Sequence, residues 1–331
     1  MKFGALTRDG GVLESADGAA RTAAIVVAAA LSVLALSPGF ADPLYKYRGE
    51  EGDWIYSDRP VAGDEPVEIR VLPSGPAIPE VTVSHSLVDR RLQLTATNSY
   101  YAPVELVLGI VALAHAVPPG PDQPLRFILA PQSDTELFAL AAIDAPAVPD
   151  IRYRYAWLAG DPASEHRPER AYRVPYAVSA SFRVSQAYPE TPTHTTASSR
   201  YAVDIEMPIG TDIHAARGGT VFEVASTHFR GGLDLDNDKD AANLIRILHD
   251  DGTYAIYAHL NWNTIRVQPG DVVSRGQYIA DSGNTGFSSG PHLHFAVLRN
   301  RGMQIESIPV VFEGPNGSEV VPSTGAQLAS Y

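Results

Sequence analysis

The middle of the chain alternates apolar and polar residues with a period of two, which is the pattern of half-buried β-strands. Arg91–Asn98 follows this pattern, and so does Ile151–Trp157. Val104–Leu113 is apolar except for Glu105, which predicts a more deeply buried strand. No amphipathic pattern of helix length intervenes. We therefore predict an all-β chain whose residues 79–180 form an immunoglobulin-like β-sandwich with a spacing or docking role.

Residues 181–311 are also rich in predicted strands, and they hold nearly all of the residues suited to chemistry. A strand is predicted from about Thr253 to His259, and glycine turns at Gly270 and Gly276 join short strands. We predict a β-sheet domain over this range. Residues 312–331 are polar and contain Gly and Pro, so we expect a loosely ordered tail.

An apolar run near the start of the chain is typical of an export signal. Ala23–Leu36 is about 14 residues long, whereas a membrane-spanning helix needs roughly 20. Arg21 precedes the run, and Gly39 and Ala41 are small residues of the kind that a signal peptidase reads. We predict a signal peptide over residues 1–41, and a mature protein without a membrane span in the periplasm or outside the cell. An uncleaved anchor and a buried helix are the alternatives.

Residues 42–75 form a small N-terminal module. Four aromatic residues flank a turn at Gly52, namely Tyr45, Tyr47, Trp54 and Tyr56. They predict a hairpin with an aromatic face. The pattern YKY, a turn with Gly, and then YSDRP resembles a short module at the front of many proteobacterial envelope proteins, which implies a Gram-negative envelope.

The composition limits the chemistry that the chain can perform. It has no cysteine, so a site for a soft metal must be built from histidines and carboxylates. Its net charge is −13 and it has no basic run, which argues against binding to nucleic acid or to anionic membranes.

His292 and His294 lie in the apolar segment HLHFAV. In a strand, residues two apart share a face, so the two imidazoles point the same way at a separation of about 6–7 Å. Polar groups placed on an apolar strand are costly unless they have partners, and a metal with water or substrate would supply them. A pair of surface histidines is the alternative.

Asp204 and His259 are candidate functional residues only because they accompany His292 and His294 in the same region of the chain. Asp204 shares a strand face with Ala202 and Glu206, and His259 ends a predicted strand. A lone Asp in a strand is more often an edge or turn carboxylate. Glycines in the loop Ser282–Pro291 allow close approach of the backbone to a ligand.

The alternating aspartates of DLDNDKD invite a calcium interpretation, which the spacing opposes. An EF-hand loop that began at Asp234 would need Gly at its sixth position and Glu at its twelfth, where this chain has Lys239 and Ile245. We expect a solvated acidic loop instead.

Several segments together resemble the lysostaphin/LytM family of zinc peptidases. The matching stretches are YAVDIEMPIGT, AARGGTV, HDDGTYAIYAHL, VQPGDVVSRGQYIADSGNTG and SSGPHLHF, in the family's order over about 100 residues. The resemblance implies a LytM-type β-sheet peptidase domain with a bound Zn²⁺. It implies that Asp204 and His294 are metal ligands, and that His259 and His292 act on the substrate and its transition state.

The first histidine ligand departs from the common HxxxD pattern of the family. Arg200 stands at that position, and His194 in PTHTTASSRYAVDI fits a longer arrangement found in a subset of members. We assign His194 as the third metal ligand, because zinc needs three protein ligands here. A site that has lost one ligand is the alternative, with His249 as a weaker substitute.

These observations predict a secreted zinc metalloendopeptidase that hydrolyses the peptide cross-links of bacterial peptidoglycan. Peptidoglycan peptides would be its partners, together with other cell-wall enzymes. The alternatives are an inactive LytM-type regulator that activates a cell-wall amidase, and a peptidase whose target is a protein.

Overall fold

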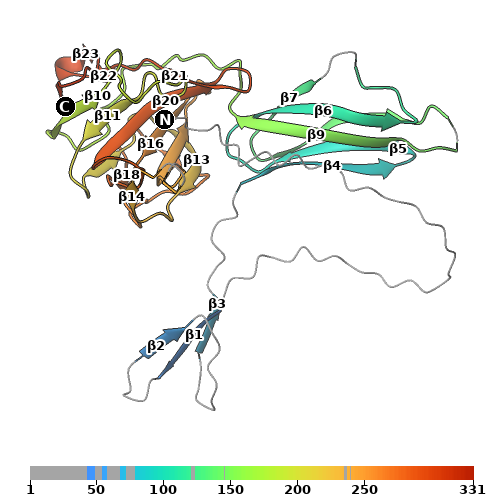
Figure 1. Ribbon diagram of the computed structural model, residues 1–331, viewed down its shortest axis with the longest axis horizontal. Helices are drawn as coiled ribbons and strands as arrows, with labels where there is room; N and C mark the ends of the chain where they lie inside the picture. Colours follow the sequence, from blue (N-terminus) through green and yellow to red (C-terminus); the bar gives the residue numbers. More distant parts are fainter. Residues whose placement is uncertain are drawn as a thin grey trace. The chain divides into compact units, whose positions relative to one another are not determined.

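A computed structural model describes residues 43–48, 54–57, 68–71, 79–120, 124–144, 146–234, 237–238 and 240–331. Within these ranges every regular element is a β-strand, apart from the 3-10 turn Pro315–Gly317, so the predicted all-β class is confirmed (Figure 1). None of the described residues forms a helix that is long and apolar enough to cross a membrane. The predicted signal peptide, residues 1–41, lies outside the described residues.

The small N-terminal module is a three-stranded antiparallel sheet in the order β2-β1-β3. Strand β1 (Pro43–Arg48) pairs with β2 (Trp54–Ser57) as the predicted hairpin, and β3 (Glu68–Val71) adds on the other side of β1. The predicted turn at Gly52 lies outside the described residues. Residues 79–331 form a separate compact unit.

Two three-stranded antiparallel sheets, β4-β5-β8 and β7-β6-β9, form a β-sandwich in the middle of the chain. The strands are β4 (Val81–Val88), β5 (Arg91–Asn98), β6 (Val104–Ala114), β7 (Leu125–Leu129), β8 (Ser133–Ala141) and β9 (Asp150–Ala159). The alternating residues of β5 and β9 place their apolar side chains, such as Leu94 and Ile151, in one shared core. The immunoglobulin-like assignment itself stays a prediction.

The C-terminal domain is built on a nine-stranded sheet in the order β17-β13-β15-β16-β20-β11-β10-β24, with β21 paired to β20. Its strands are β10 (Ser181–Gln186), β11 (Val203–Glu206), β13 (Gly219–Ala225), β15 (Leu244–Leu248), β16 (Tyr254–Ala258), β17 (Val272–Val273), β20 (His292–Asn300), β21 (Ile305–Ile308) and β24 (Gln327–Ala329). Short strand pairs flank it, formed by β12 (Asp212–His214) with β18 (Tyr278–Asp281), β14 (Gly231–Gly232) with β19 (Gly286–Phe287), and β22 (Phe312–Glu313) with β23 (Glu319–Val320).

Strand β20 divides its side chains between two cores. Leu293, Phe295 and Val297 enter the core of the C-terminal domain. Ala296 and Leu298 face the other way, on the same side as His292 and His294, and belong to one continuous buried cluster with the core of the sandwich. The sheet is therefore covered on both faces, and one end of β20 is packed against the sandwich while the other end carries the two histidines.

A buried carboxylate joins the sandwich to the C-terminal sheet. Glu105 on β6 is 2% exposed, and its Oε2 accepts hydrogen bonds of 2.8 Å from Asn300 Nδ2 and from the Met303 backbone N–H. Its Oε1 accepts a bond of 2.7 Å from Arg126. The single charged residue of an otherwise apolar strand thus binds the turn between β20 and β21.

The expectation of a loosely ordered tail over residues 312–331 is wrong. Strand β24 pairs with β10 at the edge of the main sheet, and Leu328 is buried in the core of the C-terminal domain. The segment contains too few apolar residues for its sequence pattern to predict a strand, and the exposed edge of β10 supplies the missing backbone partners.

The Glu105 junction gives a test of how firmly the two β-domains are joined. Glu105→Ala removes one acceptor each from the Asn300 amide, the Met303 N–H and Arg126, although the first two keep a second acceptor. We expect the loss of these bonds to a buried carboxylate to lower the free energy of unfolding by about 2 kcal/mol. Urea denaturation of the full chain measures it. Glu169→Ala removes an exposed carboxylate and should cost under about 0.5 kcal/mol. Equal losses in the two variants would contradict a stabilising junction.

Candidate metal centre

The register between β11 and β20 brings the first two candidate ligands together. Asp204 pairs with His294, and Glu206 pairs with His292, across an antiparallel ladder. His294 Nδ1 lies 2.8 Å from Asp204 Oδ1, and both residues are buried. Side chains directly opposite each other in such a pair share a face, so the ladder itself directs both groups into the same space.

His194 reaches the same carboxylate from a loop. Its side chain is almost fully buried, and its Nε2 lies 3.0 Å from Asp204 Oδ2. Its ring stands nearly perpendicular to that of His294, with the ring centres 5.1 Å apart. One ligand atom from each of His194, Asp204 and His294 lies within 4.8 Å of the other two.

The charges of this cluster favour an ionised carboxylate. Burial on its own would raise the pKa of Asp204, but hydrogen bonds and charge interactions with His194 and His294 outweigh it and hold that pKa well below its usual range. Burial lowers the pKa of His294, although its hydrogen bond to Asp204 acts in the opposite direction. The cluster therefore places an ionised carboxylate beside two imidazoles, a donor set that suits a cation.

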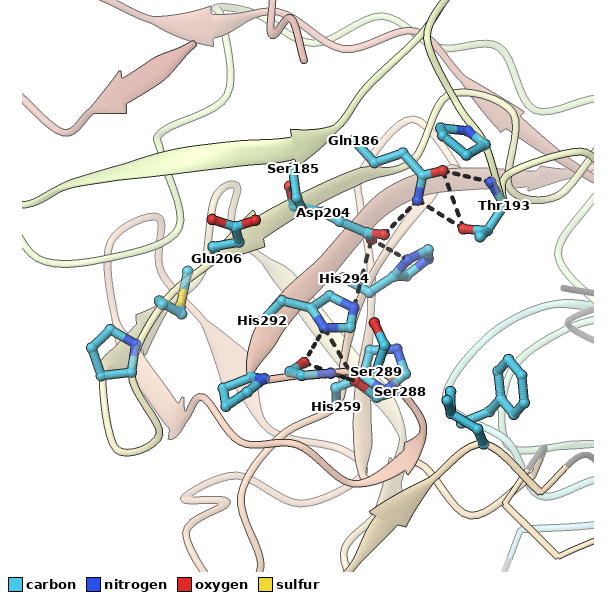
Figure 2. A pocket seen from close by; sticks show the side chains of 17 residues that line it. Ser185, Gln186, Thr193, Asp204, Glu206, His259, Ser288, Ser289, His292 and His294 are labelled. Atoms are coloured by element: carbon cyan, nitrogen blue, oxygen red, sulfur yellow. Dashed lines mark hydrogen bonds and ion pairs between the residues drawn. The ribbon is translucent and has the colours of Figure 1, made fainter. Parts of the chain in front are cut away.

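The other two histidines flank this cluster (Figure 2), and backbone carbonyls fix their tautomers. His259 Nδ1 donates to the Thr285 carbonyl at 2.7 Å. His292 Nδ1 donates to the Gly290 carbonyl at 2.8 Å. A carbonyl only accepts hydrogen bonds, so the hydrogen of each neutral ring is on Nδ1 and the lone pair is on Nε2. The ring centres of His259 and His292 are 4.5 Å apart, and His292 Nε2 lies 3.9 Å from Asp204 Oδ1.

His259 is held in an unusual state. Its φ of +63° is in the left-handed region, which is uncommon for a residue with a side chain and is often found at functional sites. Burial, together with the nearby His292 and His294, lowers its pKa to about 3, so the ring is neutral at physiological pH. Its Nε2 has no hydrogen-bond partner among the described residues.

Four of these residues, Asp204, His259, His292 and His294, line a pocket of about 850 Å³. Figure 2 shows Asp204 between Gln186 on one side and His292 and His294 on the other. The lining residues are Ser185, Gln186, Pro192, Thr193, Asp204, Glu206, Met207, Pro208, Leu233, His259, Phe287, Ser288, Ser289, Gly290, Pro291, His292 and His294. The pocket thus combines an apolar wall with a row of imidazoles and carboxylates.

Comparison with known proteins places this site in a family. Residues 198–306 match the sequence profile of peptidase family M23. Residues 198–306 thus form a domain of the M23 type, similar to that of lysostaphin. The matched range begins after His194, so the match does not include that residue.

Relatives of the M23 domain include several endopeptidases. The glycyl-glycine endopeptidase ALE-1 of Staphylococcus capitis is 32% identical over 36% of this chain and 30% of its own length. Lysostaphin of Staphylococcus simulans is 32% identical over 36% of this chain and 22% of its own. The peptidoglycan DD-endopeptidase ShyA of Vibrio cholerae is 31% identical over 39% of this chain and 28% of its own. The chain thus spans under a third of the length of each of these relatives.

The residues of the M23 domain fit a bound metal ion. Two imidazoles and one carboxylate are a donor set that zinc accepts, and the chain has no thiolate to compete. Three buried groups that converge on one point, one of them an ionised carboxylate, are also costly to hold together without a cation. His194, Asp204 and His294 are therefore the residues that would hold the ion.

The structure separates the candidates for the first histidine ligand. His194 lies beside Asp204, whereas Arg200, at the usual family position, is exposed. His249 is occupied elsewhere, because its Nδ1 donates to the Gly218 carbonyl at 2.9 Å and its ring packs against Tyr172. The loop before the M23 domain therefore brings in the histidine that the HxxxD spacing lacks.

Two of the glycines before β20 are explained by packing of the chain rather than by approach to a ligand. A Cβ at Gly283 would lie 2.6 Å from the Asn261 backbone, and one at Gly286 would lie 2.6 Å from Ala242. Gly286 also has a φ of +78°. Gly290 has open space around it, and its carbonyl orients His292.

Gln186 was not found from sequence. It is buried beside Asp204, and its amide bonds both that carboxylate and Thr193. A single glutamine near the end of a predicted strand carries no signal of its own.

His249 provides a pH test that is independent of the ligand cluster. Burial lowers its pKa to about 4, below the usual value of about 6.5 in an unfolded chain. As pH falls from about 6.5 to 4 the unfolded chain takes up a proton that the folded chain refuses, so stability is lost, on the order of 3 kcal/mol. His249→Asn keeps a donor for Gly218 and should reduce this acid loss, as measured by urea denaturation across that range.

His115→Asn is the matched control, because His115 is exposed and has a φ of +58° that Asn tolerates. It should leave the acid loss unchanged. If His249→Asn also leaves it unchanged, His249 is not buried as a neutral ring.

Proposed function

We propose that the M23 domain is a zinc-dependent endopeptidase that hydrolyses peptide cross-links of peptidoglycan in a Gram-negative envelope, in the periplasm or outside the cell. The observation that carries the proposal is the meeting of His194, Asp204 and His294 beside two histidines whose lone pairs face the same pocket. The endopeptidase relatives, one of them named for peptidoglycan, support the substrate.

The metal would be held by His194, Asp204 and His294. Bound zinc polarises a scissile carbonyl and lowers the pKa of a water molecule toward neutrality. Three protein ligands leave a coordination position for that chemistry, as in other catalytic zinc sites.

His292 is suited to take the proton of the attacking water. Its Nε2 carries the lone pair, lies 3.9 Å from Asp204 Oδ1 and lines the pocket. The Gly290 carbonyl holds Nδ1–H, so the ring stays in the tautomer that a base needs at Nε2. Ser288 Oγ, 3.3 Å from Nδ1, further limits rotation of the ring.

His259 lies beside His292 and is suited to act on the same substrate. Its Nε2 accepts a proton or hydrogen bond in the resting tautomer, because Thr285 holds the hydrogen on Nδ1. It stabilises a developing oxyanion or protonates a departing amine only after it has itself gained a proton. Its ring is 4.5 Å from that of His292, close enough for the two to serve the same substrate atoms in turn.

Digestion of purified peptidoglycan tests this proposal. The mature chain should cut the peptide cross-links, so that linked stem peptides are released as separate products. Each cut should leave one new amino end and one new carboxyl end. His292→Ala should lower kcat/KM by at least about a hundredfold, because a general base contributes that much, while retaining about one zinc per chain. Chromatography and mass spectrometry of the products measure cleavage, and atomic absorption measures zinc.

His228→Ala is the control variant, because His228 does not line the pocket. It should retain the parental rate. A zinc-loaded parent that never cleaves peptidoglycan would contradict the proposal. Stimulation of a separate amidase would then favour a regulatory role, and cleavage of proteins alone would favour a protein substrate.

A further inference from the structure

Gln186 stands at an irregular point of the sheet. It is the last residue of β10 and pairs with Asp204 on β11, and the register of the two strands shifts between Val184 and Gln186. Neighbouring residues in a regular strand face opposite sides, yet Ser185 and Gln186 both line the pocket. The irregularity therefore redirects a side chain toward the site, as β-bulges commonly do.

The amide of Gln186 connects two parts of the candidate metal centre (Figure 2). Its Nε2 donates to Asp204 Oδ2 at 2.8 Å and to Thr193 Oγ1 at 2.8 Å. Its Oε1 accepts the Thr193 backbone N–H at 2.7 Å. The carboxylate requires a donor and the N–H requires an acceptor, so only this orientation of the amide satisfies both.

The connection matters because the three candidate ligands are not held equally well. Asp204 and His294 are fixed by the backbone ladder between β11 and β20. His194 lies on a loop outside the strands, directly after Thr193. A loop ligand has more conformational freedom to lose when it binds a metal, unless other contacts have already fixed it.

We propose that Gln186 is a positioning residue that fixes the His194 loop against Asp204 and so prepares the metal centre. The amide holds the backbone next to His194 and at the same time holds one oxygen of Asp204. This inference rests on the proposed metal ligands and adds the residue that sets their geometry. It assigns Gln186 no contact with the substrate.

Metal binding by the full mature chain tests the role. Gln186→Met keeps the length of the side chain but removes its hydrogen bonds. We expect the Kd for Zn²⁺ to rise about 10- to 100-fold, as for other outer contacts of metal ligands. We also expect a changed visible absorption spectrum of the Co²⁺-substituted protein, because the geometry of the ligands changes.

Asn300→Leu is the matched control, since it removes a different buried amide at the far end of β20. It should lower the urea midpoint while leaving the Kd for Zn²⁺ and the Co²⁺ spectrum as in the parent. A general loss of stability therefore does not imitate the expected result for Gln186→Met.

Thr193→Val tests whether Gln186 acts through the loop. It removes the hydroxyl that bonds the amide, so we expect a several-fold rise in the Kd for Zn²⁺. The double variant should bind Zn²⁺ about as weakly as Gln186→Met alone, because both changes break the same connection. Thr193→Val also carries the test if Gln186→Met does not fold.

Parental Kd and Co²⁺ spectrum in a folded Gln186→Met protein, or in Thr193→Val if only that variant folds, would overturn the inference. Strictly additive losses in the double variant would overturn the route through Thr193. A parent chain that binds neither Zn²⁺ nor Co²⁺ would instead contradict the proposed function. The two failures are thus distinct.

Discussion

The pairing of β11 with β20 is the constraint on which the site depends. It places Asp204 opposite His294 and Glu206 opposite His292. The side chains of a strand alternate between its faces, so a slip of one residue would turn the imidazoles into the apolar core that Leu293 and Phe295 now fill. The hydrophobic pattern of β20 therefore sets the register, and the register sets the chemistry.

The remaining parts of the site are attached to this ladder in different ways. His259 and His292 are oriented by backbone carbonyls of the loop before β20, and His194 is brought in by a loop that precedes β11. Gln186 links that loop to Asp204. The far end of β20 is anchored to the sandwich through Asn300 and Glu105. One strand thus carries the site at one end and a domain junction at the other.

The sequence predicted those features that follow from periodicity or from a resemblance. The alternation around His292 and His294 predicted a shared face, and the alternation of β5 and β9 predicted sandwich strands with a buried side. The resemblance to the M23 family pointed to His194, although zinc binding by this residue stays a prediction.

Other features depend on tertiary contacts that leave no mark on a single sequence. The role of Gln186 depends on a register shift, and the pairing of β24 depends on a free sheet edge. The carboxylate of Glu105, an exception in an apolar strand, found its partners about two hundred residues away in Asn300 and Met303. The roles of these residues can be recognised only when the positions of the strands are known.

X-ray absorption at the zinc edge, on the zinc-loaded mature chain and on His194→Ala, would show directly whether His194 completes the metal centre. We expect about one zinc per chain, with two imidazole nitrogens and oxygen ligands in the parent. One imidazole should be lost from any zinc that the variant retains. A parent that binds no zinc, or an imidazole count that His194→Ala leaves unchanged, would contradict a metal centre completed by the loop histidine.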